Sequence, residues 1–221
     1  MRTSQIKRDT KETNINLSIN LDGDGINNIK TEIGFFNHML ELMSFHSDID
    51  IALEARGDLE VCDHHLVEDT AICIGKCIKK ALDDKRGIKR YSTVFIPMDE
   101  ALVMVSIDIS GREYLHFEAD FKRESIGSFS VEMVQEFFRA LAFNAEITLH
   151  IKVLYGENDH HKIEGIFKAF ARALKEAIKV ETNEIPSSKG CIEIFKENLL
   201  GVEKKNDCYY RLWYGEFEKC L

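Results

Sequence analysis

Asp63-His64-His65-Leu66-Val67-Glu68-Asp69 decides the fold, because the chain repeats it almost unchanged as Asn158-Asp159-His160-His161-Lys162-Ile163-Glu164. Both copies have the form D-H-H-x-x-E and lead into a long amphipathic segment. The first His and the Glu are four residues apart, so on an α-helix they share one face, within reach of one cation. The second His is rotated by about 100° on such a helix, so adjacent His residues rarely bind one ion. The pair of motifs therefore predicts two metals, each with ligands from more than one segment.

A simpler interpretation is that two helices merely begin with polar residues. Under either interpretation, Asp63 and Asp159 are expected to be the N-caps of these helices. One H-H-x-x-E motif would leave that interpretation open. Two copies, each followed by a similar helical pattern, make coincidence a poor explanation.

The apolar pattern around the motifs also repeats in the same order. The first half reads as strands over 2–10, 15–21, 26–31 and 49–53, with helices over 34–46 and from 63 to about 87. The second half reads as strands over 91–97, 101–109, 112–120 and 147–153, with helices over 130–143 and from 159. The predicted fold class is α+β, with internally duplicated β-β-β-α-β-α halves, each a sheet backed by helices, related by a pseudo-twofold. We expect half-repeats at 1–88 and 89–190, and a C-terminal extension at 191–221 for which the sequence suggests no role.

The repeat can be aligned residue by residue. His64 to His160 is 96 residues, and so is Glu68 to Glu164. With an offset of 98 for earlier positions, His38 aligns with Glu136. Each half thus offers four candidate metal ligands, which are His38, His64, His65 and Glu68, and Glu136, His160, His161 and Glu164. Eight ligands at helix starts cannot easily converge within one small subunit, so we expect the metals to bridge subunits of a homo-oligomer.

Composition limits the possible partners and compartment. The formal net charge of -9 argues against a general nucleic-acid or anionic-membrane binder. No apolar run could span a bilayer, and the N-terminus has no signal-peptide pattern. The six cysteines contain no C-x-x-C pair, which favours reduced thiols in a cytoplasmic protein. Cys73 and Cys77 fit core packing on a helix, and Cys62 is expected to be a small buried residue.

The chain resembles the imidazoleglycerol-phosphate dehydratase family over roughly residues 2–190. The resemblance rests on several stretches in order, namely Lys11-Glu12-Thr13, Gly34-Phe35-Phe36-Asn37-His38-Met39-Leu40, Asp63 to Asp69, Pro97-Met98-Asp99-Glu100, Asp108-Ile109-Ser110-Gly111-Arg112, Asn158 to Glu164, Phe167-Lys168-Ala169-Phe170 and Pro186-Ser187-Ser188-Lys189-Gly190. The chain departs from the family at Asn37, where Asp is usual, at Leu66, where Thr is usual, and at Glu136, where many members carry a ligand His. It also continues past Gly190 with an aromatic extension.

The resemblance implies a lyase of histidine biosynthesis that removes water from imidazole glycerol phosphate to give imidazole acetol phosphate. It implies two Mn²⁺ ions per active site and a 24-subunit shell with active sites between subunits. The leaving hydroxyl is not adjacent to a carbonyl, so the imidazole ring must accept electron density, as a dimanganese-bound imidazolate. Mixed imidazole and carboxylate ligands suit Mn²⁺, and Zn²⁺ remains a chemical competitor.

The resemblance also implies roles for individual residues. Glu12 matches the family's catalytic Glu, and Glu164 combines metal ligation with proton transfer. The small phosphorylated imidazole substrate is expected to contact Glu12, His46, Arg90, Arg112, Lys168, Ser187 and Lys189. His116 and His150 have no partner at motif spacing and are interpreted as structural.

Two other function classes remain open. One is a different dinuclear metalloenzyme acting on a small phosphate ester, although such enzymes usually bridge their metals with Asp. The other is a non-catalytic, metal-stabilised shell protein, which leaves Glu12, Arg112 and Ser187 to Lys189 without a purpose.

Overall fold

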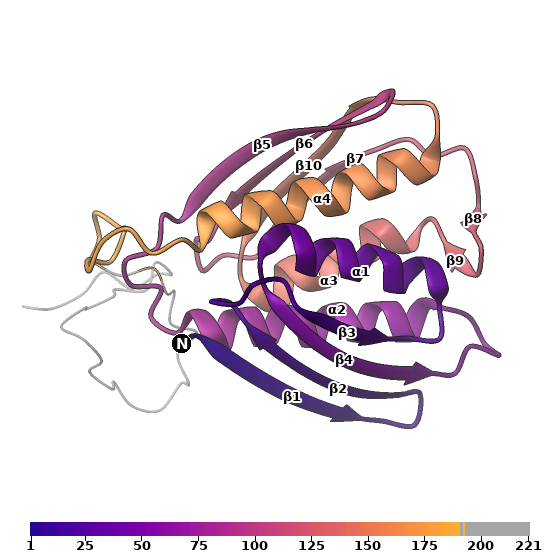
Figure 1. Cartoon of the computed structure of the whole chain (residues 1–221), viewed down its shortest axis with the longest axis horizontal. Coiled ribbons are helices and arrows are strands. Elements are labelled where there is room, and N and C mark those ends of the chain that lie inside the picture. Colours follow the sequence, from indigo (N-terminus) through magenta and orange to yellow (C-terminus); the bar gives the residue numbers. More distant parts are fainter. Residues whose placement is uncertain (191, 193–221) are drawn as a thin grey trace, which may run out of the picture.

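The computed structural model describes residues 1–190 and 192, and these form four layers in the order sheet, helices, helices, sheet (Figure 1). The predicted C-terminal extension at 191–221 therefore lies outside the described residues, apart from Ile192. The first half contains β1 (Thr3–Asp9), β2 (Thr13–Asn20), β3 (Asn27–Lys30), α1 (Gly34–Ser47), β4 (Asp50–Gly57) and α2 (His64–Leu82). Its sheet has the order β1-β2-β4-β3, with β3 parallel to β4 and the other neighbours antiparallel.

The second half repeats this arrangement. It contains β5 (Tyr91–Met98), β6 (Ala101–Asp108), β7 (Tyr114–Glu118), β8 (Ser125–Ile126), β9 (Phe129–Ser130), α3 (Met133–Ala145), β10 (Thr148–Tyr155) and α4 (Asp159–Ala177). Its main sheet has the order β5-β6-β10-β7, again with one parallel pair, β7 and β10. The predicted fold class is confirmed. The β8–β9 hairpin was not predicted, because strands of two residues are too short to show an apolar period.

The duplication extends to backbone detail and to helix packing. Asp48, after α1, and Glu146, after α3, are 98 residues apart, and both have the left-handed conformation, with φ of 58° and 52°. Such residues commonly end helices. In space, α1 packs against α4 and α2 packs against α3. Each helix that begins at a D-H-H-x-x-E motif, α2 or α4, therefore lies beside the helix of the other half that carries Glu136 or His38, as a pseudo-twofold requires.

The core lies between the two sheets. Alternate residues of the strands point inward, among them Ile15 and Leu17 of β2, because successive side chains of a strand face opposite sides. Phe137 and Phe138 of α3 pack against Phe167 of α4 with ring centroids 5.2 and 5.0 Å apart. These contacts fix how α3 and α4 lie against each other within the second half. Phe36 of α1 extends the packing across the two halves, with its ring centroid 5.6 Å from that of Phe137.

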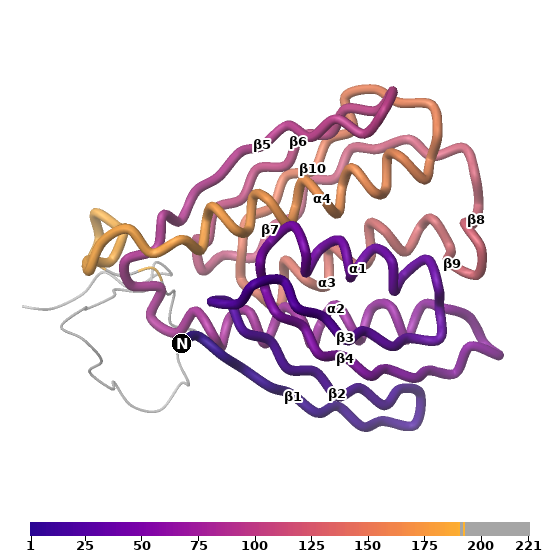
Figure 2. The backbone as a smooth tube through the Cα atoms, in the orientation of Figure 1, coloured from indigo at the N-terminus to yellow at the C-terminus, as the bar shows by residue number. Residues whose placement is uncertain are grey.

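The chain passes from one half to the other beside the end of α4 (Figure 2). Gly87 donates a backbone hydrogen bond to Glu184 O, and Ile88 forms an isolated bridge with Val180. The expected boundary at residue 88 falls in this link and stays a prediction.

Three local expectations were wrong. Ser130 belongs to β9 and does not begin α3. Asp63 precedes α2, yet its carboxylate accepts hydrogen bonds from Ser130 instead of capping the helix. Asp159 is the first residue of α4, which Asn158 caps by accepting from His160 N.

The thiols and the helix lengths give two further comparisons. Cys73 and Cys77 are buried as expected, whereas Cys62 is exposed, contrary to expectation. Across the described residues, no helix has the length and hydrophobicity needed to cross a membrane.

Candidate metal centres

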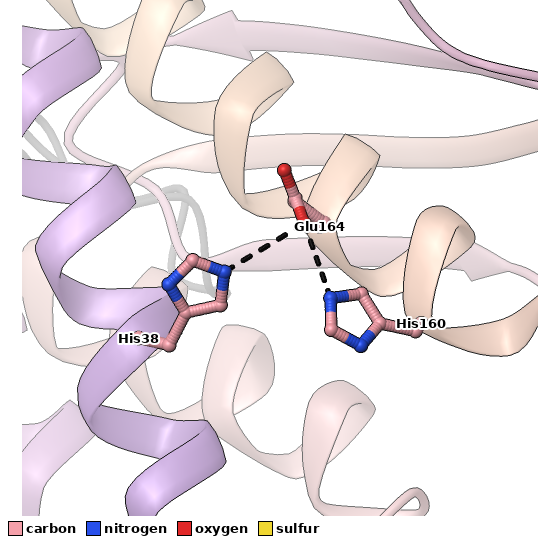
Figure 3. Close-up of side chains that lie close together, drawn as sticks. All are labelled: His38, His160 and Glu164. Atoms are coloured by element: carbon pink, nitrogen blue, oxygen red, sulfur yellow. Dashed lines mark hydrogen bonds and ion pairs between the residues drawn. The ribbon is translucent and has the colours of Figure 1, made fainter.

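The first group of potential ligands joins α1 to α4 (Figure 3). His38 reaches from α1, and His160 and Glu164 reach from α4, so that both imidazoles face one carboxylate. Glu164 Oε2 lies 3.7 Å from His38 Nε2 and 3.2 Å from His160 Nε2. One ligand atom from each residue lies within 4.8 Å of the others. This spacing suits shared contact with one cation.

The second group joins α2 to α3 and is the pseudo-twofold counterpart of the first. It consists of His64, Glu68 and Glu136, again with ligand atoms within 4.8 Å of one another. His64 Nε2 lies 3.5 Å from Glu68 Oε2, the same four-residue pairing as in α4. Each group therefore takes its His-x-x-x-Glu pair from one half and its third residue from the other half.

The two groups differ in charge. The first has one carboxylate, and the second has two, because Glu136 stands where the first has His38. Arg139, one turn after Glu136 on α3, forms ion pairs with Glu136 and with Glu68 Oε1, the latter at 3.3 Å. Its positive charge offsets the extra carboxylate and links the two ligand helices.

The second His of each motif lies outside these groups. His65 Nδ1 lies 3.1 Å from Asp58, and His161 Nδ1 lies 2.7 Å from Glu100. These hydrogen bonds raise the pKa of both imidazoles. A rotation of about 100° between adjacent helix residues explains the separation. The structure thus gathers six of the eight candidate ligands and orients the other two elsewhere.

The donor chemistry of both groups fits Mn²⁺, which accepts mixed imidazole and carboxylate ligands. Three protein ligands leave positions for further ligands, unlike the closed four-ligand shells of structural zinc sites. The imidazoles of His38, His64 and His160 are each about 40% exposed or more, so such ligands could approach from outside.

Glu164 is the most enclosed of these carboxylates. Burial alone would raise its pKa, but hydrogen bonds from Lys168 and His160 outweigh burial and lower the pKa. Lys168 Nζ lies 2.5 Å from Glu164 Oε1. Lys168, an expected phosphate contact, is therefore joined directly to a candidate metal ligand.

Other expected phosphate contacts gather at the far end of α4. Arg90 Nε pairs with Asp108 at 2.8 Å, and Arg112 lies 3.9 Å from the same carboxylate. Arg90 also donates to Pro186 O, beside Ser187 and Lys189. The backbone of Arg90 bonds to Ala177 O, at the end of α4. Glu164 is thirteen residues before Ala177 on the same helix, and an α-helix rises about 1.5 Å per residue. These phosphate contacts therefore lie about 20 Å from the first group of potential ligands.

Glu12 and His46 lie in different surroundings. Glu12 is in the turn between β1 and β2, where its carbonyl accepts from Asp58 N, close to His65 and α2. His46 lies near the end of α1, and its buried Nδ1 has no hydrogen-bond partner among the described residues. Burial lowers the pKa of its imidazole, and the charges of Arg172 and Lys168 act in the same direction.

A cavity of about 360 Å³ adjoins the second group. His64 and Glu136 lie in its wall with Phe117 and Phe121. An aromatic wall beside potential metal ligands suits a planar ring, as small-molecule sites combine apolar surface with few polar groups.

Sequence reasoning missed several residues around these groups. Arg139 could have been found from its three-residue spacing to Glu136. Glu100 could have been found from its position in the turn equivalent to that of Glu12. Asp69 lies inside the quoted motif, but its partners Thr13 and Arg8 are more than fifty residues away in sequence, so no local signal marked it.

Comparison with known proteins gives a consistent result. Residues 31–174 match the family model described as imidazoleglycerol-phosphate dehydratase. Proteins of that name from Clostridium botulinum and Clostridium acetobutylicum are each 58% identical, covering 86% of this chain and 98% of theirs. The crystal structure of the Staphylococcus aureus protein superposes with a TM-score of 0.73 at 46% identity, covering 79% of this chain and 97% of its own. The crystal structure of the Pyrococcus furiosus protein superposes with a TM-score of 0.74 at 36% identity, covering 84% of this chain and 99% of its own.

Proposed function

Because this chain belongs to the imidazoleglycerol-phosphate dehydratase family of histidine-biosynthesis hydro-lyases, we propose that it converts imidazole glycerol phosphate to imidazole acetol phosphate with two Mn²⁺ ions per active site. The observation that carries the metal part of this proposal is the pair of donor groups. Each holds a His-x-x-x-Glu pair and a third ligand from the other half. Two equivalent metal sites would match the two nitrogens of the substrate's imidazole ring.

The family is metal-dependent, and Mn²⁺ is the ion that these donors favour. His38, His160 and Glu164 would hold one ion, and His64, Glu68 and Glu136 another. Such ions lower the pKa of a bound ring nitrogen, so that the ring can take up electron density when hydroxide leaves.

The chain's own residues supply proton transfer and substrate positioning. Glu12 is the proposed acid–base group, because its turn lies at the ligand end of α2 and its side chain is outside both donor groups. Arg90, Arg112, Ser187 and Lys189 bind the phosphate, with Lys168 and His46 as further contacts. Glu164 combines ligation with proton transfer.

The separation within one chain supports active sites shared between subunits. The phosphate contacts near the end of α4 lie about 20 Å from the first donor group, so within one chain the two cannot bind the same small substrate molecule. His65 and His161, turned away from their own groups, remain as ligands for a neighbouring subunit's ions. We therefore propose a homo-oligomer of 24 subunits, in which these contacts complete each site. A cytoplasmic location and the absence of nucleic-acid partners stay predictions.

Metal analysis combined with a dehydratase assay on the purified protein tests this proposal. We expect imidazole acetol phosphate to form and chelation to abolish its formation, with Mn²⁺ restoring it. Release of inorganic phosphate without dehydration would instead favour a phosphoesterase. Metal-containing particles that catalyse neither dehydration nor phosphate release would favour the non-catalytic shell protein.

A further inference from the structure

The two halves contain equivalent turns that end in a glutamate, and the two glutamates are held differently. Glu12 directly precedes β2, and Glu100 directly precedes the equivalent strand β6. The Glu100 carboxylate accepts backbone hydrogen bonds from Asn158 at 2.7 Å and Glu157 at 3.1 Å, and contacts His161. These bonds, that from Asn158 foremost, lower the pKa of Glu100 to about 2. Glu100 therefore serves as a fixed, ionised acceptor in its turn.

The turn containing Glu12 is held by its neighbours instead. Thr10 Oγ1 accepts from the backbone N–H groups of Glu12 and Thr13, at 3.1 and 2.9 Å. The Thr13 hydroxyl donates to Asp69 Oδ2 at 2.5 Å, and Arg8 Nε lies 2.8 Å from the same oxygen. Asp69 is on α2, next to the candidate ligand Glu68. Within residues 1–190, no hydrogen bond or ion pair engages the Glu12 carboxylate.

Thr13 and Asp69 are both buried, with 3% and 7% of their surface exposed. A buried hydroxyl that donates to a buried carboxylate is a short, charge-assisted bond that fixes the separation of the segments it joins. It fastens the turn before β2 to the helix that carries His64 and Glu68.

The second half lacks both members of this pair. Ala101 follows Glu100 as Thr13 follows Glu12, and Gly165 follows Glu164 as Asp69 follows Glu68. An added Cβ at Gly165 would lie 2.9 Å from Val103 Cγ2, so α4 packs against β6 at a distance that excludes an aspartate. The hydrogen-bonded pair is thus present only in the half whose turn glutamate is not held by other groups.

We propose that Thr13 and Asp69 are positioning residues, which fix the Glu12 turn against α2 so that the Glu12 carboxylate stays available for proton transfer beside the metal ligands. This inference rests on the role of Glu12 given under the proposed function. Displacement of a catalytic group by about 1 Å can cost about 100-fold in rate, so a rigid attachment matters.

Thr13→Val tests the attachment, because it removes the hydroxyl and keeps the shape of the side chain. We expect kcat to fall about 10–100-fold, with KM and bound manganese near those of the unaltered protein. Thr13→Ser keeps the hydroxyl and should restore kcat to within about threefold. Thr70→Val is the matched control, since Thr70 is a fully buried threonine next to Asp69 whose hydroxyl has no partner among the described residues.

The double variant Glu12→Gln/Thr13→Val separates positioning from general structural damage. If Thr13 acts through Glu12, adding Thr13→Val to Glu12→Gln should lower kcat no further. Losses that multiply, or a Thr13→Val enzyme within threefold of normal kcat, would overturn the inference. Should Thr13→Val fail to fold, Asp69→Asn in the same cycle decides between the same outcomes. Near-normal turnover by Glu12→Gln alone would instead reject the proposed role of Glu12.

Discussion

Glu68→Gln should release metal, whereas the same chemical change at Glu12 should not. Glu68 supplies one of three ligand atoms in the second donor group, and Glu12 belongs to neither group. Even outer-shell partners of metal ligands are worth about 10–100-fold in affinity, so loss of a direct carboxylate ligand should cost about 100-fold or more. The Glu12 variant should keep its metal and lose about 10²–10⁴-fold in rate.

The cost to stability can be divided into two parts. At a free-ion concentration of about 100 times Kd, the bound ion adds about 2.7 kcal/mol to the free energy of unfolding. A 100-fold weaker site retains only about 0.4 kcal/mol of this. Glu68 also loses its ion pair with Arg139, but the two side chains are 31% and 44% exposed, so that pair contributes only about 0.2–1 kcal/mol.

Urea titrations with Mn²⁺ and with chelator resolve these parts, alongside elemental analysis of bound manganese. With Mn²⁺, Glu68→Gln should be less stable by more than about 2 kcal/mol. With chelator, the difference should shrink to about 1 kcal/mol or less. Wild-type metal content in Glu68→Gln, or metal loss in Glu12→Gln, would refute this reasoning.

Three further predictions concern packing, pH and assembly. Gly75→Ala puts a methyl group about 2.6 Å from Leu141 O. It should therefore lower the free energy of unfolding, measured by urea titration, by about 1–3 kcal/mol, and weaken manganese binding between α2 and α3. Gly34→Ala, where the added methyl group meets open space, is the control. Burial raises the pKa of Asp50, but hydrogen bonds from Ile26 and Asp24 N–H outweigh it and lower the pKa. The ionised Asp50 carboxylate contributes its full stabilisation at pH values above its pKa in the unfolded chain, near 3.8, and this stabilisation is lost as pH falls through its lower pKa in the folded protein. Asp50→Asn should therefore lower the free energy of unfolding more at about pH 7 than at about pH 3, as measured by urea titration. Complete chelation should reduce particle size in sedimentation velocity, and an unchanged profile would contradict metal bridging.

Much of the fold could be predicted from sequence, because its signals are local. The alternation of Ile15, Leu17 and Ile19 marks β2, and the spacing of Ile163, Phe167 and Phe170 marks α4. What could not be predicted lacks such a signal. The β8–β9 hairpin is too short to show a period, and Asp63 bonds to Ser130, sixty-seven residues away.

The sequence by itself determined the duplication, the fold class and the pairing of His64 with Glu68 and of His160 with Glu164. Helix geometry fixes a four-residue spacing on one face wherever the helix lies. Tertiary structure alone decided that His38 joins His160 and Glu164 of the other half and not His64 and Glu68 of its own. It also decided that Thr13 meets Asp69, and that Arg139 links Glu68 to Glu136. These pairings depend on which helix faces pack across the core, and packing joins residues whose separation along the chain leaves no periodic trace.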